Sequence, residues 1–161
     1  MKTKWGETLD PAHVLPEYPR PQLIRSSYLN VNGMWAYAIT ADDNRQQGFD
    51  GQILVPFSPE SVLSGVQRTV EPKDRLWYRR TFTLPAGFNR GRVFLHFGAV
   101  DQYAQVYVND VQVCTHMGGY LPFSAEITQA LRRGENTLLV LVRDWTDTSF
   151  HARGKQKTER G

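Results

Sequence analysis

Hydrophobic and polar residues alternate along much of the chain beyond Gly33, which is the pattern of strands that bury one face. Residues 76–84 are the clearest case, because Leu76, Tyr78 and Phe82 share one face and Trp77 begins the other. Residues 137–142 are continuously apolar, which predicts a strand buried on both faces. Further strands are expected at residues 34–40, 52–57, 92–97, 104–108 and 111–115.

Turn-forming residues separate these segments and indicate how they connect. Asn109-Asp110 stands between two alternating runs and predicts a β-hairpin with a two-residue loop. Helical signal is slight: one turn is expected after Ser58 as its N-cap, and another over residues 127–132. Several short strands with Gly, Pro, Asn and Asp between them predict an all-β fold, a β-sandwich of the jelly-roll type.

The first part of the chain lacks this periodicity. Residues 1–33 contain Pro11, Pro16, Pro19 and Pro21, which favour an extended, Pro-rich arm. We therefore predict an N-terminal arm packed on the sandwich (residues 1–33), a sandwich domain (34–150) and a basic segment (151–161).

The net charge of the 161-residue chain is +3, which by itself would suggest an acidic partner. Residues 151–161 hold four basic side chains and one acidic one, so the rest of the chain is neutral. That neutral body shows no basic stripe with interleaved aromatic residues, so we expect no nucleic-acid partner.

Cysteine usage and hydropathy bear on where the protein is found. A single cysteine, Cys114, excludes an intramolecular disulfide. No apolar run approaches the roughly 20 residues that span a bilayer, and residues 1–7 lack the apolar stretch of a secretory signal. These features predict a cytoplasmic protein without a membrane partner.

Groups that could carry catalysis or bind a metal are scattered. The four histidines lack metal-ligand spacing, so neither a metal nor another cofactor is expected. Cys114 and His116 are expected on one strand face, but no visible group would orient the histidine as a base. The sixteen acidic residues include no pair that sequence alone brings together. Aromatic residues in strands and loops are the one feature that indicates carbohydrate binding, although most such rings belong to cores.

A set of short motifs runs in order from about residue 20 to residue 150. They are residues 28–35 (YLNVNGMW), 55–61 (VPFSPES), 63–65 (LSG), 77–82 (WYRRTF), 95–101 (LHFGAVD), 106–109 (VYVN), 116–123 (HMGGYLPF) and 144–147 (DWTD). Together they resemble the N-terminal sugar-binding domain of glycoside hydrolase family 2, the β-galactosidase and β-glucuronidase family. The resemblance implies a galactose-binding-like jelly roll.

The residues of these motifs are expected to have mainly structural roles. Gly118-Gly119 is expected in a loop with positive φ that Tyr120 and Phe123 anchor, and Asp101 is expected to cap a turn. The structural motif residues on this interpretation are Trp35, Pro56, Trp77, Asp101, Gly118, Gly119 and Tyr120.

The resemblance also implies that this chain is non-catalytic. The acid/base and nucleophile glutamates of the family reside in a TIM barrel that follows this domain and an immunoglobulin-like domain, and a barrel takes about 250 residues. We therefore expect a domain that braces a barrel it does not contain. The parent protein would be a retaining β-glycosidase. A homo-oligomer of that full enzyme is a further expectation from the resemblance.

In some relatives the loop after the last strand of this domain lends a polar residue to the sugar pocket. By resemblance, the corresponding rim residues here are Asp147, Arg153, Lys155 and Gln156. Two alternatives to the accessory role stay open at this point. One is a stand-alone carbohydrate-binding module, and the other is a pure interaction domain.

Overall fold

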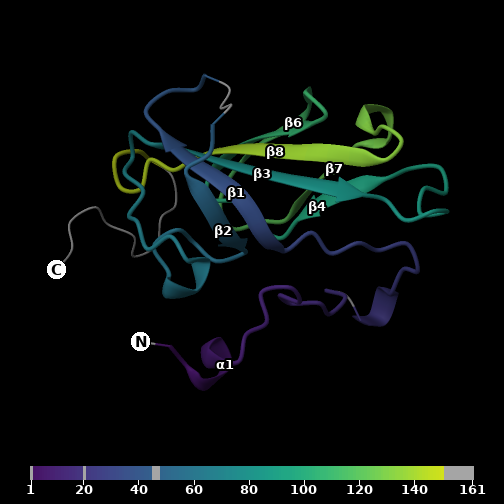
Figure 1. The fold of residues 1–161 in the computed structure, drawn as a ribbon. Helices are drawn as coiled ribbons and strands as arrows, with labels where there is room; N and C mark the ends of the chain where they lie inside the picture. The colour runs from purple at the N-terminus through teal and green to yellow at the C-terminus, as the bar shows by residue number, and fades with distance from the viewer. Residues whose placement is uncertain (1, 20, 45–47, 151–161) are drawn as a thin grey trace.

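The protein is described by a computed structural model that covers residues 2–19, 21–44 and 48–150 (Figure 1). Its described part contains a six-stranded antiparallel sheet and a two-stranded one, which confirms the predicted all-β sandwich. The large sheet has the order β2 (Gly51–Val55), β1 (Gly33–Thr40), β3 (Arg75–Thr83), β8 (Glu135–Arg143), β5 (Tyr103–Val108) and β6 (Val111–Met117). The small sheet pairs β4 (Phe94–Phe97) with β7 (Phe123–Glu126).

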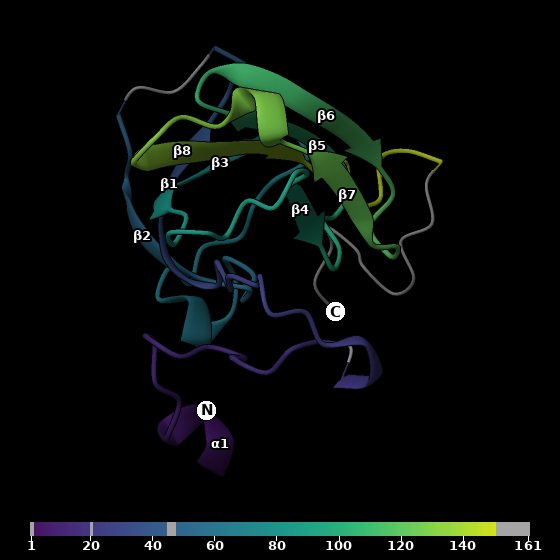
Figure 2. The same cartoon turned by 90° about the vertical axis from the view of Figure 1, so that its right-hand side faces the viewer.

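The small sheet lies beneath the β5–β6 side of the large sheet, so the two form layers (Figure 2). The main core fills the space between them. Val106 and Val108 of β5 are fully buried in it, as the alternating pattern of that strand requires. Leu95 of β4 and Ala125 of β7 meet this core from the other layer.

The outer face of the large sheet carries a second, smaller core, which we call the outer cluster. It consists of Ala38, Trp77, Leu139 and Leu141, and the side chains of Phe49 in the β1–β2 loop and Tyr107 in β5 pack against it. Strand β8 contributes to both cores, since residues 138–142 are all buried. The prediction that this segment is buried on both faces is therefore confirmed.

The β5–β6 connection is the predicted two-residue hairpin. Asn109 and Asp110 have φ values of 48° and 74°, the positive pair that a type I′ turn requires. Asn109 is also buried, and its amide donates hydrogen bonds to the carbonyl of Ala130 (2.8 Å) and to Oδ1 of Asn136 (2.7 Å).

The helical turns are shorter than predicted. The first is a 3₁₀ turn, η2 (Val62–Ser64), and its N-cap is Ser61 rather than Ser58. The reason is local: Oγ of Ser61 accepts the N–H of Ser64 at 3.2 Å, whereas Ser58 contributes only its carbonyl, to the preceding turn. The second turn narrows to η3 (Thr128–Ala130).

The segment before Gly33 contains a short helix that the sequence pattern did not predict. Helix α1 (Lys4–Glu7) is capped by Thr3, whose Oγ1 accepts the N–H of Gly6 at 3.2 Å, and η1 (Pro21–Leu23) follows it. Residue 32 is held to the sheet, because Arg80 donates to its carbonyl at 2.7 Å. The extended arm is therefore not confirmed. Within the described ranges, no helix has the length and apolar character that crossing a membrane demands.

Candidate functional site

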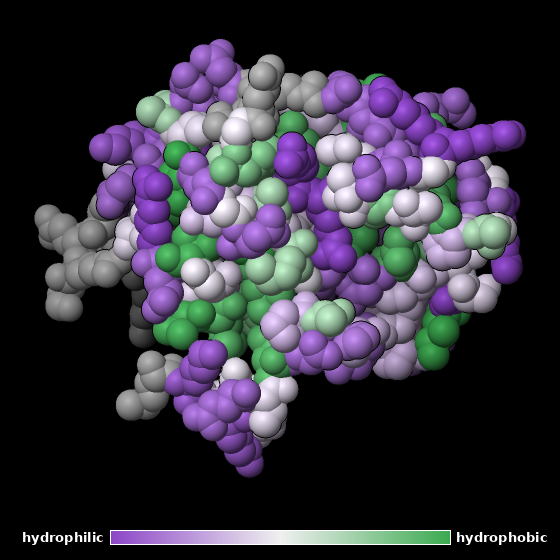
Figure 3. Space-filling model, viewed as in Figure 1, coloured by the Kyte–Doolittle hydropathy of each residue, from purple (hydrophilic) through white to green (hydrophobic). Residues whose placement is uncertain are grey.

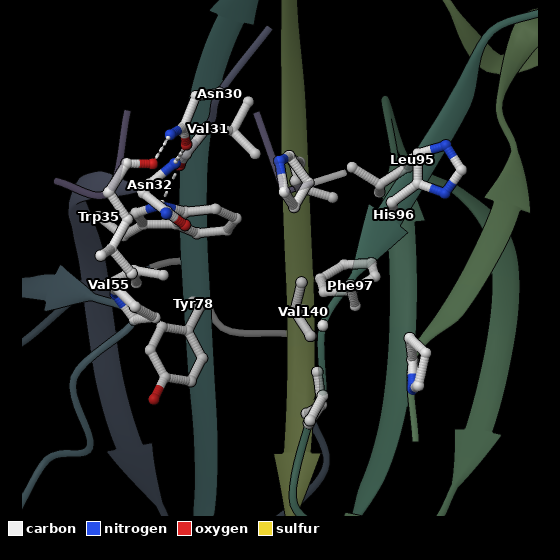
Figure 4. Close-up of a pocket in the computed structure, with 18 of the residues that line it drawn as sticks. Asn30, Val31, Asn32, Trp35, Val55, Tyr78, Leu95, His96, Phe97 and Val140 are labelled. Atoms are coloured by element: carbon white, nitrogen blue, oxygen red, sulfur yellow. Dashed lines mark hydrogen bonds between the residues drawn. The ribbon is translucent and has the colours of Figure 1, made fainter. Parts of the chain in front are cut away.

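A cavity of about 1610 Å³ lies between the two sheets and the segment that precedes Gly33. Trp35 and Tyr78 stand on one side of it and Leu95 and Phe97 on the other, with Val140 between them (Figure 4). Hydrophobic residues also gather on the surface where the body meets the N-terminal segment (Figure 3). The cavity is thus the interior of the sandwich, and its walls suit apolar groups.

The polar groups at the upper rim of this cavity already have partners within the chain. The indole N–H of Trp35 donates to the carbonyl of Val31 at 2.8 Å. The backbone N–H of Asn32 donates to Oδ1 of Asn30 (2.8 Å), whose Nδ2 donates to the carbonyl of Leu15 (2.6 Å). These bonds fix residues 30–32 over the indole (Figure 4).

Tyr78 is the titratable group on the cavity wall beside Trp35. The two rings meet edge to face, with centroids 6.4 Å apart. Burial raises the pKa of Tyr78, and the negative charge of Glu60 raises it further. The phenol is therefore neutral, and this wall offers packing rather than acid–base chemistry.

Three loops converge at one end of the same cavity, which we call the loop end. They follow β4, β6 and β8 and bring Asp101, Gly119 and Asp144 to the cavity lining. The N–H of Gly118 donates to the carbonyl of Gln102 (2.8 Å), and the N–H of Gln102 donates to the carbonyl of Arg143 (3.1 Å). Backbone hydrogen bonds thus tie all three loops together at this end of the cavity.

Gly119 is pressed against the carboxylate of Asp101. A Cβ added at Gly119 would lie 2.6 Å from Cγ of Asp101. We predict that Gly119→Ala lowers the free energy of unfolding by about 1–3 kcal/mol, because the carboxylate must move. Urea denaturation measures this loss.

Gly98→Ala is the matched control for this prediction, since a Cβ there would meet open space. It should change stability by less than about 0.5 kcal/mol. The double variant Asp101→Ala/Gly119→Ala should lose less than the sum of the two single losses, since the clash has gone. Strictly additive losses would contradict the contact.

An aromatic stack connects the sheets beside the loop end, and the sequence analysis missed it. The ring of His116 lies 4.1 Å from that of Phe123, which lies 4.7 Å from that of Phe97. His116 is also hydrogen bonded through Nε2 to the carbonyl of Gly118 at 3.0 Å. The sequence pattern predicted the strands that carry Phe97 and His116. It did not predict that β7 pairs with β4, which brings Phe123 between the two rings.

Cys114 shares the face of His116, as predicted from their spacing, but it packs against the main core. Burial raises the pKa of its thiol, which opposes the thiolate that a nucleophile needs. His116 is engaged in the stack instead. The described residues therefore contain no Cys–His nucleophile at this position.

The loop of residues 118–122 is anchored differently from the expectation. Gly118 has the predicted positive φ, at 118°, and Phe123 anchors the loop through the stack. Tyr120 does not anchor it, since its side chain is 61% exposed. The prediction for Tyr120 was wrong because the turn at Gly118 directs residues 120 and 121 into solvent.

The remaining predicted residues have diverse surroundings. Trp35 and Trp77 are buried, and Pro56 lines the cavity directly after β2. Asp147 lies half-buried in a turn after β8. Arg153, Lys155 and Gln156 lie outside the described residues. In the described part of the chain, no group of three or more His, Cys, Asp and Glu side chains is placed to hold a metal.

Comparisons with known proteins agree with the architecture. Residues 45–154 match the family described as glycosyl hydrolases family 2, sugar binding domain. A β-glucuronidase of Paenibacillus borealis is 28% identical over 88% of this chain and 25% of its own length. The β-glucuronidase of Felis catus is 33% identical over 73% of this chain and 20% of its own length.

Solved structures give the same result. The β-D-glucuronidase of Dictyoglomus thermophilum matches with a TM-score of 0.54 and 29% identity, over 72% of this chain and 19% of that one. The Bifidobacterium dentium β-glucuronidase, solved with coumarin-3-O-glucuronide, matches with a TM-score of 0.55 and 27% identity, over 70% and 19%. The chain thus spans a quarter or less of the length of these relatives.

Proposed function

Because the chain belongs to the sugar binding domain family of the glycosyl hydrolases family 2, we propose that it serves as the N-terminal accessory domain of a larger β-glucuronidase-like enzyme. The observation that carries this proposal is the unequal coverage. A relative named β-glucuronidase matches 88% of this chain with only 25% of its own length. A domain that forms one part of an enzyme accounts for that ratio.

In this proposal the chemistry belongs to a barrel outside this chain. Retaining glycosidases cleave through two carboxyl groups about 5–5.5 Å apart, one acting as acid/base and the other as nucleophile. The cavity described above lies between the two sheets and is lined chiefly by apolar groups. The domain would therefore act by bracing the barrel and shaping the rim of its sugar pocket.

The proposed rim is the segment that follows β8, with Asp147, Arg153, Lys155 and Gln156. Its support is position: Asp147 comes three residues after Asp144, which lines the loop end together with Asp101. The division into an arm and a sandwich body at residue 33, the cytoplasmic location and a homo-oligomer of the full enzyme are likewise proposals.

Two measurements test the accessory role. The purified chain should hydrolyse neither 4-nitrophenyl β-D-glucuronide nor the corresponding galactoside above the rate in buffer, whereas the product of the gene that encodes this domain should hydrolyse the glucuronide. The Asp147→Ala variant of that product should have a higher KM for the glucuronide, because a rim contact has been lost.

Glu135→Ala is the matched control, since this exposed carboxylate lies at the opposite end of β8. It should leave KM unchanged. Turnover by the isolated chain at an enzyme-like rate would disprove the accessory role. An equal KM for both variants would remove Asp147 from the rim and leave the accessory role standing.

A further inference from the structure

One face of β5 is turned toward the small sheet and the other away from it (Figure 2). A row of polar and aromatic side chains lies on the outer face. Tyr103, Gln105 and Tyr107 alternate with the fully buried core residues of the strand, so they point away from the main core. All three are partly exposed. At the strand start, the ring of Trp145 lies 6.3 Å from that of Tyr103.

Hydrogen bonds link this row into one polar line. Nε2 of Gln105 donates to the hydroxyl of Tyr103 at 3.1 Å, and the hydroxyl of Tyr107 donates to Oε1 of Gln105 at 3.4 Å. On the neighbouring strand β6, Thr115 pairs with Gln105 and Gln112 pairs with Tyr107, and both are exposed. We call these six residues the tyrosine strip: Tyr103, Gln105, Tyr107, Gln112, Thr115 and Trp145.

The strip adjoins the outer cluster on one side, where Tyr107 packs against that cluster. Phe49 packs on that cluster from the β1–β2 loop, with the guanidinium of Arg79 4.1 Å from its ring centroid. At the Tyr103 end, Arg143 pairs with Tyr103 in the register and is bound to Asp43, which also binds Arg75 at 2.6 Å. One carboxylate is thus shared by two arginines at this border, whereas the strip itself contains only uncharged side-chain types.

We propose that the tyrosine strip is a binding platform for a neutral, linear oligosaccharide. A pyranose ring presents C–H groups on its faces and hydroxyl groups at its edge. The tyrosine and tryptophan rings offer amphipathic contact area, and the amides and hydroxyls between them match sugar hydroxyls. From Tyr103 to Tyr107 the strand advances roughly 13 Å, so the platform spans more than one sugar ring.

Other ligand classes fit this surface less well. Nucleic acid requires cations along its path, and the strip has none among its six residues. A protein partner is favoured by large exposed apolar groups at the centre of the patch. On this part of the sheet such groups, Val111 and Met117, lie at the two ends of β6, with Met117 opposite Tyr103 at the end of the strip and neither at its centre.

This platform goes beyond the accessory role proposed above. It lies on the outer face of β5 and β6 and, within the described residues, meets the segment after β8 only through Trp145, whereas the proposed rim residues begin at Asp147. It would hold the glycan portion of a substrate or an attached polysaccharide without taking part in cleavage. Either proposal can fail while the other stands.

The test is titration calorimetry of the full 161-residue chain with cellohexaose, xylohexaose and maltohexaose. We expect millimolar or tighter binding of at least one of them. Tyr107→Ala should weaken that binding by between about twofold and tenfold, and Tyr103→Ala/Tyr107→Ala should weaken it by at least about tenfold. Tyr103→Phe and Tyr107→Phe, which keep the rings, serve as folded comparisons, and circular dichroism checks every variant.

Tyr120→Ala is the matched control, because Tyr120 is an exposed tyrosine outside the strip. Its affinity should equal that of the unmodified chain. Absence of binding by the folded chain to all three hexasaccharides would overturn the proposal. Binding that Tyr120→Ala abolishes and the strip variants leave intact would also overturn it, by moving the site to the loop end. The proposal would also be overturned if the strip variants sedimented differently from the unmodified chain while no sugar was bound.

Discussion

The Trp77→Ala variant is expected to lose about 3–5 kcal/mol of its free energy of unfolding. Trp77 is 2% exposed and is the largest member of the outer cluster, where it packs with Leu139 and Leu141. Its indole N–H also donates to Oγ1 of Thr40 at 3.1 Å. Removal of the ring leaves a cavity under the β1–β2 loop, and small domains have only about 5–15 kcal/mol of stability in all. Urea denaturation followed by circular dichroism measures the loss.

Trp5→Ala provides the matched control, since Trp5 is 71% exposed. It should change stability by less than about 0.5 kcal/mol. Trp77→Phe keeps a ring but loses the hydrogen bond, so its loss in the free energy of unfolding should lie between those of Trp77→Ala and Trp5→Ala. Equal losses for Trp77→Ala and Trp5→Ala would show that the outer cluster contributes little to stability.

The position of Trp77 shows what the sequence pattern could supply. Alternation in residues 76–84 correctly placed Trp77 on the face opposite Tyr78, and the continuous apolar run of 137–142 correctly predicted burial on both faces. Together these two patterns imply an apolar group outside the main core. They do not say that Phe49 covers it, because the β1–β2 loop lacks periodicity.

The loop end shows where sequence reasoning stops. Asp101 and Gly119 belong to separate motifs, and only the folded chain reveals that a side chain at residue 119 would collide with the carboxylate. The stack of His116, Phe123 and Phe97 is a similar case. Local rules supply strands, turns and faces, whereas contacts between loops depend on how the two sheets are layered.

The same limit applies to the tyrosine strip. The alternation in residues 104–108 predicts that Gln105 and Tyr107 leave the main core, which the structure bears out. Their hydrogen bonds to one another, and the approach of Trp145 to Tyr103, depend on geometry across the end of the sheet. A surface of this kind is found by inspecting the outer face after the core has been assigned.

Asn136 is another residue whose role the sequence conceals. It precedes an apolar run and is typical of a turn, yet it is 1% exposed. Its Oδ1 accepts hydrogen bonds from Nδ2 of Asn109 (2.7 Å) and from the N–H of Arg132 (2.7 Å). Its Nδ2 donates to the carbonyls of Arg132 (3.2 Å) and Gly134 (3.0 Å). One side chain thus ties the β5–β6 hairpin to the loop before β8.

We expect Asn136→Ala to lower the free energy of unfolding by about 3–5 kcal/mol. Each buried polar group that loses its partner costs about 1–3 kcal/mol, and the substitution strips partners from more than one group. Asn109→Ala should cost a comparable amount. The double variant should lose clearly less than the sum, because both substitutions disrupt one network. Urea denaturation of the three variants measures the coupling.

Asn89→Ala is the control for these variants, since Asn89 is exposed and accepts one local hydrogen bond, from the N–H of Gly91 at 2.9 Å. Its cost should stay below about 1 kcal/mol. Additive losses for Asn109 and Asn136 would contradict a shared network. Because Asn109 directly follows the strand that carries Tyr103, Gln105 and Tyr107, the network also bears on the proposed binding surface. Loosening it should raise hydrogen exchange along β5 and β6 before it affects β1 and β2, which lie at the other edge of the sheet.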